Sequence, residues 1–342
     1  MVSYFLHRIL KESNQHGVIL GATSGDTGSA AIHACKGYSN IKTFILLPEG
    51  NMSEIQRRQM STVDQENVFA IKVNGTFDDC QDIVKQAFKT DQYLPDNFTL
   101  LAVNSINWLR IIAQICYYFF AYASLNTTKP LCFSVPSGNF GNVFSAYSAY
   151  KMGLPIKEIC VAVNSNDILH RFFSNNDYSK QPTVSTISPS MDISVASNFE
   201  RLVYDYYLDR DANRCRELFN SFNSNQLQLD PEIFENKLNL FSSLAVSDSE
   251  TKNIINYFFK EHEYILDPHS AIACKRALEE SNTYVIGMAT AHPDKFPTLF
   301  NSLNIQITDH HPALKGLKDK EERLVVLPCE YSAIRDFIRN SL

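Results

Sequence analysis

Two glycine-containing loops carry the residue types most suited to chemistry in this 342-residue sequence. Residues 21–28 (GATSGDTG) and residues 136–142 (PSGNFGN) each follow an apolar run and precede a helical pattern. Backbone N–H groups at the start of a helix, aided by the helix dipole, bind phosphate. We therefore predict two backbone nests that can hold phosphate groups.

The second loop has the composition of a nest for a phosphate monoester. Ser137, Gly138 and Asn139 precede Gly141, so several N–H groups can point toward one position beside a helix start. A plain strand-to-helix turn is the alternative, and this loop alone leaves it open.

The first loop adds polar side chains to its backbone amides. Thr23, Ser24 and Thr27 supply hydroxyl groups beside a second helix start, and Asp26 supplies a carboxylate. This set suits a ligand with carboxylate or phenolate oxygens. The alternative is that Asp26 and Thr27 only cap the helix, a role that both residue types often fill.

An arginine follows a polar segment at the start of a long apolar helix, in residues 104–110 (NSINWLR). Arg110 lies one turn beyond Asn107. A guanidinium can bind an anion bidentately, and a charge-assisted contact of this kind is worth about 1.5–3 kcal/mol. A solvated arginine is the alternative.

Thr290 lies in residues 287–293 (GMATAHP), between a strand pattern and a helical pattern. This position is at the carboxyl edge of a strand, where α/β proteins bind ligands, and the hydroxyl group can hydrogen-bond a ring nitrogen. The nearby His292 is interpreted as structural. Asp267 is interpreted as the N-cap of a helix with Pro268 at its first position.

Strand-like runs alternate with helical patterns along most of the chain. This succession predicts an α/β fold with a parallel sheet and helices on both faces. The strands are expected at 18–20, 43–47, 68–73, 131–135, 159–163 and 284–288, and the helices at or near Thr27, Ser53, Phe77, Asn142, Asp167 and Asp294. Residues 196–262 are polar with apolar residues at helical spacing, such as Phe234, Leu238 and Phe241, and are predicted to be an all-helical insertion.

Composition argues against several kinds of partner. A net charge of −6 with a pI near 5.9 gives no basic footprint for nucleic acid. The most apolar stretch, 111–125, contains Gln114 and is shorter than the roughly 18 residues that a spanning helix needs, so no membrane segment is predicted. The eight cysteines form no C-x-x-C pair, which favours reduced thiols in a cytoplasmic protein over a disulfide or metal site.

A short-chain dehydrogenase is a rival interpretation. Gly21-x-x-x-Gly25 and Tyr147-x-x-x-Lys151 superficially match that group, which uses a nicotinamide cofactor. The first loop lacks the final glycine spacing of the group, the chain is longer, and Tyr147 fits an ordinary amphipathic helix. The rival is therefore not favoured.

Taken together, the motifs resemble those of threonine synthase. The match follows the family's order through residues 22–30 (ATSGDTGSA), 79–81 (DCQ), 104–107 (NSIN), 135–142 (VPSGNFGN), 191–194 (MDIS), 267–269 (DPH) and 290–293 (TAHP). Threonine synthases have the pyridoxal-phosphate fold type II, which they share with tryptophan synthase β. The resemblance therefore implies a smaller α/β domain at 1–125 and a larger cofactor domain at 126–342, on either side of the cofactor.

The resemblance also implies roles for individual residues. The second loop holds the phosphate of pyridoxal 5′-phosphate, and Thr290 faces the pyridine nitrogen as a neutral partner. The implied cofactor-binding residues are Asp26, Ser137, Gly138, Asn139, Phe140, Gly141, Asn142 and Thr290. The implied substrate-binding residues are Ser24, Thr27, Ser105, Asn107 and Arg110.

The family's Schiff-base lysine has no counterpart in this sequence. The family carries it in an Ala-Phe-Lys-Asp motif, which the resemblance places just before Met1, and no lysine lies between Met1 and Arg8. Lys11 and Lys295 do not match its position. An internal start, a split or decayed gene, and a non-catalytic relative are the explanations, and the first two are preferred.

The implied function is that of threonine synthase, which converts O-phospho-L-homoserine and water to L-threonine and phosphate in cytoplasmic amino-acid biosynthesis. Turnover is expected to be negligible without the upstream lysine. A phosphohomoserine lyase that releases a keto acid, and a non-catalytic relative that binds phosphate ligands, are the alternatives. The expected partner is the small-molecule substrate, without nucleic acid or membrane, and both a monomer and a homodimer stay open.

Overall fold

The computed structural model describes residues 2–23, 25–49, 52–90, 93–222, 226–279 and 284–342. The chain separates into two compact units, and each is described by itself. The first unit comprises Met1–Leu109 and Asp309–Leu342, and the second unit comprises Arg110–Thr308. Among the described helices, none combines the length and the apolarity needed to cross a membrane.

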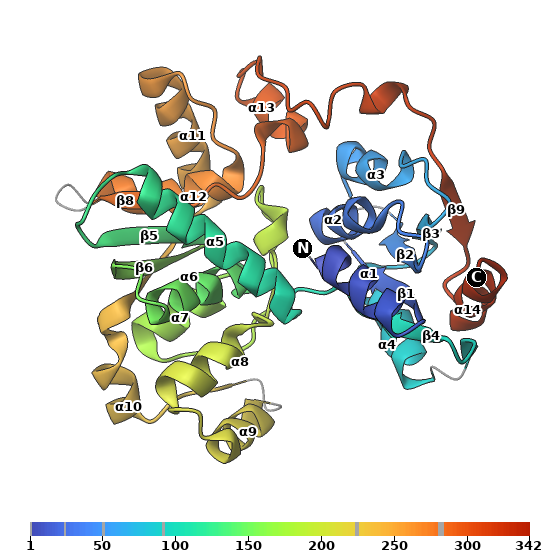
Figure 1. Ribbon diagram of the computed structural model, residues 1–342. Coiled ribbons are helices and arrows are strands. Elements are labelled where there is room, and N and C mark those ends of the chain that lie inside the picture. Colours follow the sequence, from blue (N-terminus) through green and yellow to red (C-terminus); the bar gives the residue numbers. More distant parts are fainter. Residues whose placement is uncertain (1, 24, 50–51, 91–92, 223–225, 280–283) are drawn as a thin grey trace. The chain divides into compact units, whose positions relative to one another are not determined.

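The first unit is built on a five-stranded parallel sheet with the order β4-β1-β2-β3-β9. Figure 1 shows β9 and α14, in red, beside the blue elements of this unit. The elements are α1 (Val2–Glu12), β1 (His16–Ala22), α2 (Asp26–Cys35), β2 (Ile41–Pro48), α3 (Glu54–Ser61), β3 (Val68–Val73), α4 (Phe77–Lys89), β4 (Phe98–Leu101), β9 (Leu324–Leu327) and α14 (Tyr331–Asn340).

Helices cover both faces of this sheet, as predicted for parallel strands. Along β2, Phe44 packs in one cluster with Ile83 of α4 and Ile334 of α14. The next residue, Ile45, packs in a separate cluster with Ile32 of α2. Because successive side chains of a strand point to opposite faces, an apolar run is needed where both faces are buried.

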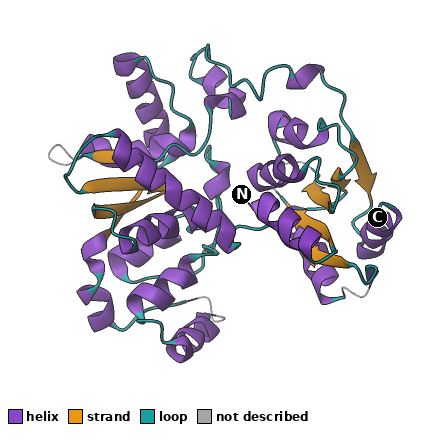
Figure 2. Cartoon of the chain, in the orientation of Figure 1, coloured by secondary structure: helices purple, strands orange, loops and turns teal. Residues whose placement is uncertain are grey.

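The second unit is built on a four-stranded parallel sheet with the order β7-β6-β5-β8. In Figure 2 the strands of the unit lie together, with helices around them. The elements are α5 (Trp108–Ser124, whose first two residues belong to the first unit), β5 (Leu131–Pro136), α6 (Gly141–Lys151), β6 (Ile156–Val163), α7 (Ile168–Asn175), α8 (Phe199–Leu202), α9 (Ala212–Ser221), α10 (Pro231–Asn236), β7 (Phe241–Ala245), α11 (Asp248–His262), α12 (Pro268–Glu279), β8 (Val285–Gly287) and α13 (Pro297–Ser302). Helix α12 packs against β5 and β8, and α6 and α7 pack against β6.

The predicted all-helical insertion at 196–262 is wrong at one point, because β7 lies within it. This strand pairs in parallel with β6, from Ile159 beside Phe241 to Val163 beside Ala245. β7 lies at the edge of the sheet and pairs on one side only, where a strand with two serines is tolerated. Of the residues with helical spacing, Phe234 lies in the short helix α10, and Phe241 is the first residue of the strand.

The predicted division into 1–125 and 126–342 differs from the two units of the structure. Strand β9 pairs with β3, and Ile334 and Ile338 of α14 join the core of the first unit, so this unit takes up the last part of the sequence. In α5, Ile111 and Tyr118 are buried in the core of the second unit. The contacts of these elements, rather than their order in the sequence, decide the division.

Candidate functional site

The two predicted cofactor segments of the second unit follow neighbouring strands. β5 ends at Pro136 and β8 ends at Gly287, and the two strands pair in parallel with Ser134 beside Gly287. Residues 137–142 begin directly after β5, and Thr290 lies three residues after β8. The structure thus brings both segments to the carboxyl edge of one sheet, where α/β proteins bind ligands.

The shape of residues 137–142 is set by side-chain hydrogen bonds within the loop. The Ser137 hydroxyl accepts the N–H of Phe140 at 3.1 Å and donates to Oδ1 of Asn142 at 2.7 Å. Nδ2 of Asn142 donates to the Pro136 carbonyl at 2.8 Å. These bonds explain why serine and asparagine stand at the two ends of the loop: they fix its backbone and use only the Phe140 amide among those between them.

Phe140 holds an unusual backbone conformation at the start of α6. Its φ of 66° lies in the left-handed region, which a bulky side chain seldom adopts. The ring is fully buried and packs on Phe173 and Phe199, with centroids 6.2 and 5.5 Å away. Core packing of the ring therefore stabilises a left-handed backbone conformation that phenylalanine seldom adopts.

The loop has backbone N–H groups that can donate to a ligand, as a phosphate nest requires. In the described part of the chain, no acceptor is recorded for the N–H groups of Gly138, Asn139, Gly141 and Asn142. These donors surround the start of α6, which carries about half a positive charge. The donor set fits the phosphate of pyridoxal phosphate.

Gly138 packs closely against a neighbouring backbone segment. A Cβ atom there would lie 3.0 Å from Cα of Met191 and 3.3 Å from the carbonyl oxygen of Ser190. These atoms are backbone and cannot rotate away, so residues 190–191 form a wall behind the loop.

Thr290 is held through its backbone and presents its side chain at the surface. Its N–H donates to the hydroxyl of Ser270 at 3.3 Å, and its side chain is exposed. Among the described residues, no partner is recorded for the Thr290 hydroxyl, which leaves it available to a ligand. The neighbouring His292 accepts the N–H of Asp294 at 3.2 Å, which confirms its predicted structural role.

Sequence reasoning recognised Asp267 as an N-cap but missed the cluster that it forms. Its carboxylate accepts the N–H groups of His269 and Ser270 at 2.9 and 3.3 Å, and α12 begins at Pro268 as predicted. Burial would raise the pKa of Asp267, but the hydrogen bonds that its carboxylate accepts from His269 and Ser270 outweigh it, so the pKa is lowered. The buried Asp267 is an ionised carboxylate inside the second unit.

In the first unit, Thr23 shapes the loop that follows β1, a role that sequence reasoning did not assign. Its hydroxyl accepts the N–H groups of Gly25 and Gly28, each at 3.0 Å. Helix α2 begins at Asp26, and its N-cap Gly25 has no side-chain hydrogen bond. Asp26 and Thr27 are half-buried in the first turn, and they are not the N-cap that the alternative required. Ser24 lies outside the described residues.

The predicted substrate residues 105 and 107 follow β4, the neighbour of β1, so they lie at the same sheet edge as the first loop. Ser105 and Asn107 are half-buried, and Oδ1 of Asn107 accepts the N–H of Leu109 at 3.0 Å. Asn107 thus supports the start of α5 through one of its side-chain atoms.

Arg110, in the first turn of α5, belongs to the second unit. Burial lowers the pKa of its guanidinium. Over the ranges that the structure describes, no carboxylate is recorded beside it, unlike Arg171, which binds both Asp167 and Asp177. A half-buried arginine without an acidic partner is suited to an anionic ligand.

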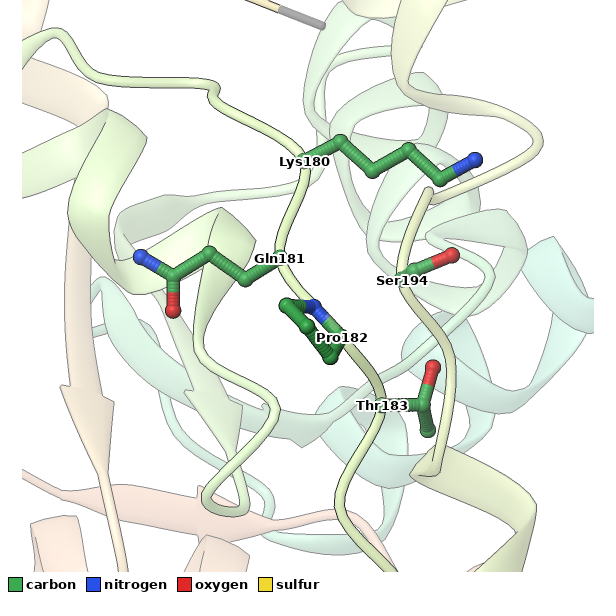
Figure 3. Close-up of a pocket in the computed structure, with 5 residues that line it drawn as sticks. All are labelled: Lys180, Gln181, Pro182, Thr183 and Ser194. Atoms are coloured by element: carbon green, nitrogen blue, oxygen red, sulfur yellow. The ribbon is translucent and has the colours of Figure 1, made fainter.

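A pocket that no sequence pattern indicated lies beside the segment that backs Gly138. It has a volume of about 420 Å³ and is lined by Lys180, Gln181, Pro182, Thr183 and Ser194. Figure 3 shows Gln181 pointing to the opposite side of its backbone from Lys180. Ser194 directly follows Ile193, whose side chain lies 3.3 Å from the Cβ position of Gly138. The lining has polar and cationic groups but no arrangement of donors comparable to that of residues 137–142.

Comparison with known proteins agrees with this geometry. Residues 1–219 match the family model described as "Pyridoxal-phosphate dependent enzyme", and residues 270–338 match "Threonine synthase, C-terminal". The chain is 43% identical to a threonine synthase of Pseudomonas aeruginosa, over 99% of this chain and 73% of that protein. It is 40% identical to a threonine synthase of Saccharomyces cerevisiae, over 96% of this chain and 67% of that protein.

Solved structures give the same result. The chain superimposes on a threonine synthase of Brucella melitensis with bound pyridoxal phosphate at a TM-score of 0.93 and 38% identity, over 99% of this chain and 74% of that one. The yeast enzyme gives a TM-score of 0.90 at 35% identity. A maize serine racemase, at a TM-score of 0.53 and 13% identity, shares the fold alone. The chain belongs to the threonine synthase family of enzymes that depend on pyridoxal phosphate.

Proposed function

We propose that this chain is the threonine synthase that converts O-phospho-L-homoserine and water to L-threonine and phosphate in the cytoplasm. The observation that carries the proposal is the set of four unused amides in residues 138–142, beside the available hydroxyl of Thr290 at the next strand end. When bound, pyridoxal phosphate supplies an electron sink for carbanion chemistry. The chain's own residues bind and orient it.

In this proposal, residues 137–142 hold the cofactor phosphate and Thr290 faces the pyridine nitrogen. A hydroxyl group, unlike a carboxylate, gives that nitrogen a neutral partner and leaves it unprotonated. Asp26, at the start of α2 in the first unit, is assigned to the phenolic oxygen by its match to the family's motif. The donors that fit the phosphate and the neutral hydroxyl both lie in the second unit.

The substrate residues are assigned by charge and residue type. Arg110 pairs with the phosphate of O-phosphohomoserine, because its half-buried guanidinium has no acidic partner in the described ranges. Ser105 and Asn107 add polar donors to the same phosphate. Thr27, in the first turn of α2, and Ser24 are assigned to the substrate carboxylate by residue type.

The experiment compares this chain with a form extended by the coding sequence upstream of Met1. Each is mixed with pyridoxal phosphate, and borohydride trapping followed by peptide mapping locates a lysine bonded to the cofactor. We expect the extended form to be trapped and to release threonine and phosphate from O-phosphohomoserine. Release of a keto acid would identify a lyase instead, and a failure of both forms to bind the cofactor would refute the proposal.

A further inference from the structure

A buried polar cluster at the start of α12 contacts both cofactor segments of the second unit. The cluster consists of Asp267, His269 and Ser270, whose exposed fractions are 2%, 3% and 4%. Such deep burial of polar groups is costly unless each hydrogen bond is satisfied. Hydrogen bonds therefore fix these three side chains in position, and they also fix the backbone groups that the side chains bind.

One branch of the cluster leads to Thr290. The Ser270 hydroxyl donates to Oδ2 of Asp267 and accepts the N–H of Thr290 at 3.3 Å. This is the one hydrogen bond recorded for Thr290 in the ranges that the structure covers. Because α12 also packs against β8, Ser270 joins the Thr290 backbone to the framework of the sheet.

The other branch leads to the wall behind Gly138. Nδ1 of His269 lies 3.1 Å from Oδ1 of Asp267, and Nε2 accepts the N–H of Ser190 at 3.3 Å. The carboxylate can only accept, so Nδ1 carries the proton and Nε2 is free to accept. The Ser190 carbonyl and the Met191 Cα then lie 3.3 and 3.0 Å from the Cβ position of Gly138.

We propose that Asp267, His269 and Ser270 are positioning residues that align the two cofactor segments with each other. Ser270 sets where Thr290 meets the pyridine nitrogen, and His269 sets the wall that shapes the phosphate loop. Asp267 orients both through one carboxylate. This inference rests on the proposed cofactor site. It adds that the Ser270 branch acts on Thr290 and that the His269 branch acts on the phosphate loop.

The test uses 4′-deoxypyridoxine 5′-phosphate labelled with ¹⁵N in the ring, because this analogue lacks the aldehyde and binds without a lysine. Two quantities are measured on the chain: the dissociation constant by calorimetry, and the ¹⁵N chemical shift of the bound ring. The dissociation constant reports mainly on the phosphate loop. The ¹⁵N chemical shift reports on the partner of the ring nitrogen.

Ser270→Ala is expected to change the ring ¹⁵N shift while inorganic phosphate binds with unchanged affinity. Ser270→Thr keeps the hydroxyl and is expected to restore the shift. His269→Leu is expected to weaken phosphate and analogue binding by about 3- to 10-fold, the effect of losing one hydrogen bond. At saturation, its ring ¹⁵N shift should match the wild type.

Matched controls separate positioning from general destabilisation. Ser148→Ala removes a half-buried serine hydroxyl that donates to the Phe144 carbonyl, and His170→Leu removes a half-buried histidine that bonds Ser243. Both should leave the affinity and the shift unchanged. Thermal unfolding is followed for every variant, and Ser270→Cys replaces Ser270→Ala if the alanine variant does not fold.

The outcomes distinguish a failure of the proposed cofactor site from a failure of the positioning inference. If the wild-type chain binds neither the analogue nor inorganic phosphate, the proposed cofactor site itself is refuted. If the wild type binds but folded Ser270→Ala or Ser270→Cys shows the wild-type ¹⁵N shift, the positioning inference is overturned. Equal effects of the Ser270 and His269 substitutions on both readouts would also overturn it.

Discussion

Adding one methyl group at Gly138 should disturb the phosphate loop through its wall. In Gly138→Ala the new Cβ would lie 3.0 Å from Cα of Met191, and 3.3 Å from both the Ser190 carbonyl and Cγ1 of Ile193. Two of these atoms are backbone, so relief requires the loop or the wall to move by a few tenths of an ångström. Movement of the loop would displace the four amides that are proposed to bind phosphate.

The size of the effect follows from the cost of overpacking, about 1–3 kcal/mol. If the loop moves to relieve the contact, the strain appears as weaker phosphate binding, and 1–3 kcal/mol corresponds to roughly 5- to 150-fold in affinity. If residues 190–191 move instead, the same strain lowers the free energy of unfolding. The two losses together should therefore amount to about 1–3 kcal/mol.

The assay combines calorimetric titration with inorganic phosphate and urea unfolding of the same variant. Gly153→Ala is the matched control, because its Cβ meets open space but its φ of 97° costs an alanine about 1–3 kcal/mol in stability. That variant should lose stability and keep its phosphate affinity. A folded Gly138→Ala protein that keeps both the phosphate affinity and the free energy of unfolding of the wild type would refute this reasoning.

Three other substitutions test single residues. Arg110→Gln should weaken O-phosphohomoserine binding by about 10- to 150-fold, the loss of a charge-assisted contact, and leave cofactor-analogue binding unchanged in calorimetry. Thr290→Asp in the extended enzyme should favour side reactions, since a carboxylate favours a protonated ring nitrogen; an unchanged product ratio in chromatography would contradict this. The lowered pKa of Asp267 means that its ionised form contributes stability above its unfolded pKa of about 3.9, and that this stability is lost as pH falls through the folded value. Asp267→Asn should therefore flatten the decline in unfolding free energy as the pH falls below about 4, measured by urea titration at each pH.

The interior strands were predictable because burial on both faces requires a run of apolar residues that is visible within a few positions of the sequence. β2 and β3 are buried on both faces, so their sequences are nearly continuous apolar runs. The missed strands β4, β7 and β9 all lie at sheet edges. An edge strand has one neighbour and a partly exposed surface, so its sequence can be short and mixed and gives little signal.

The same distinction between local and distant contacts holds for the site. The loop at 137–142 shapes itself through Ser137 and Asn142, five residues apart, and its residue types therefore indicated a nest. His269 bonds Ser190, which lies 79 positions away, and Ser270 bonds Thr290, 20 positions away. No local pattern encodes such partners, so the sequence indicated a helix cap at Asp267 and not the cluster.

The discontinuity of the first unit also bears on the order in which the chain can fold during synthesis. All of the second unit is synthesised before Leu324–Leu327, so β3 is made long before its neighbour β9. During that interval β3 presents an unpaired parallel edge, and Ile334 and Ile338 have not yet covered the apolar side chains of α4. An open strand edge with exposed apolar surface is prone to aggregation. The nascent chain therefore presents this strand edge and this apolar surface until β9 and α14 emerge.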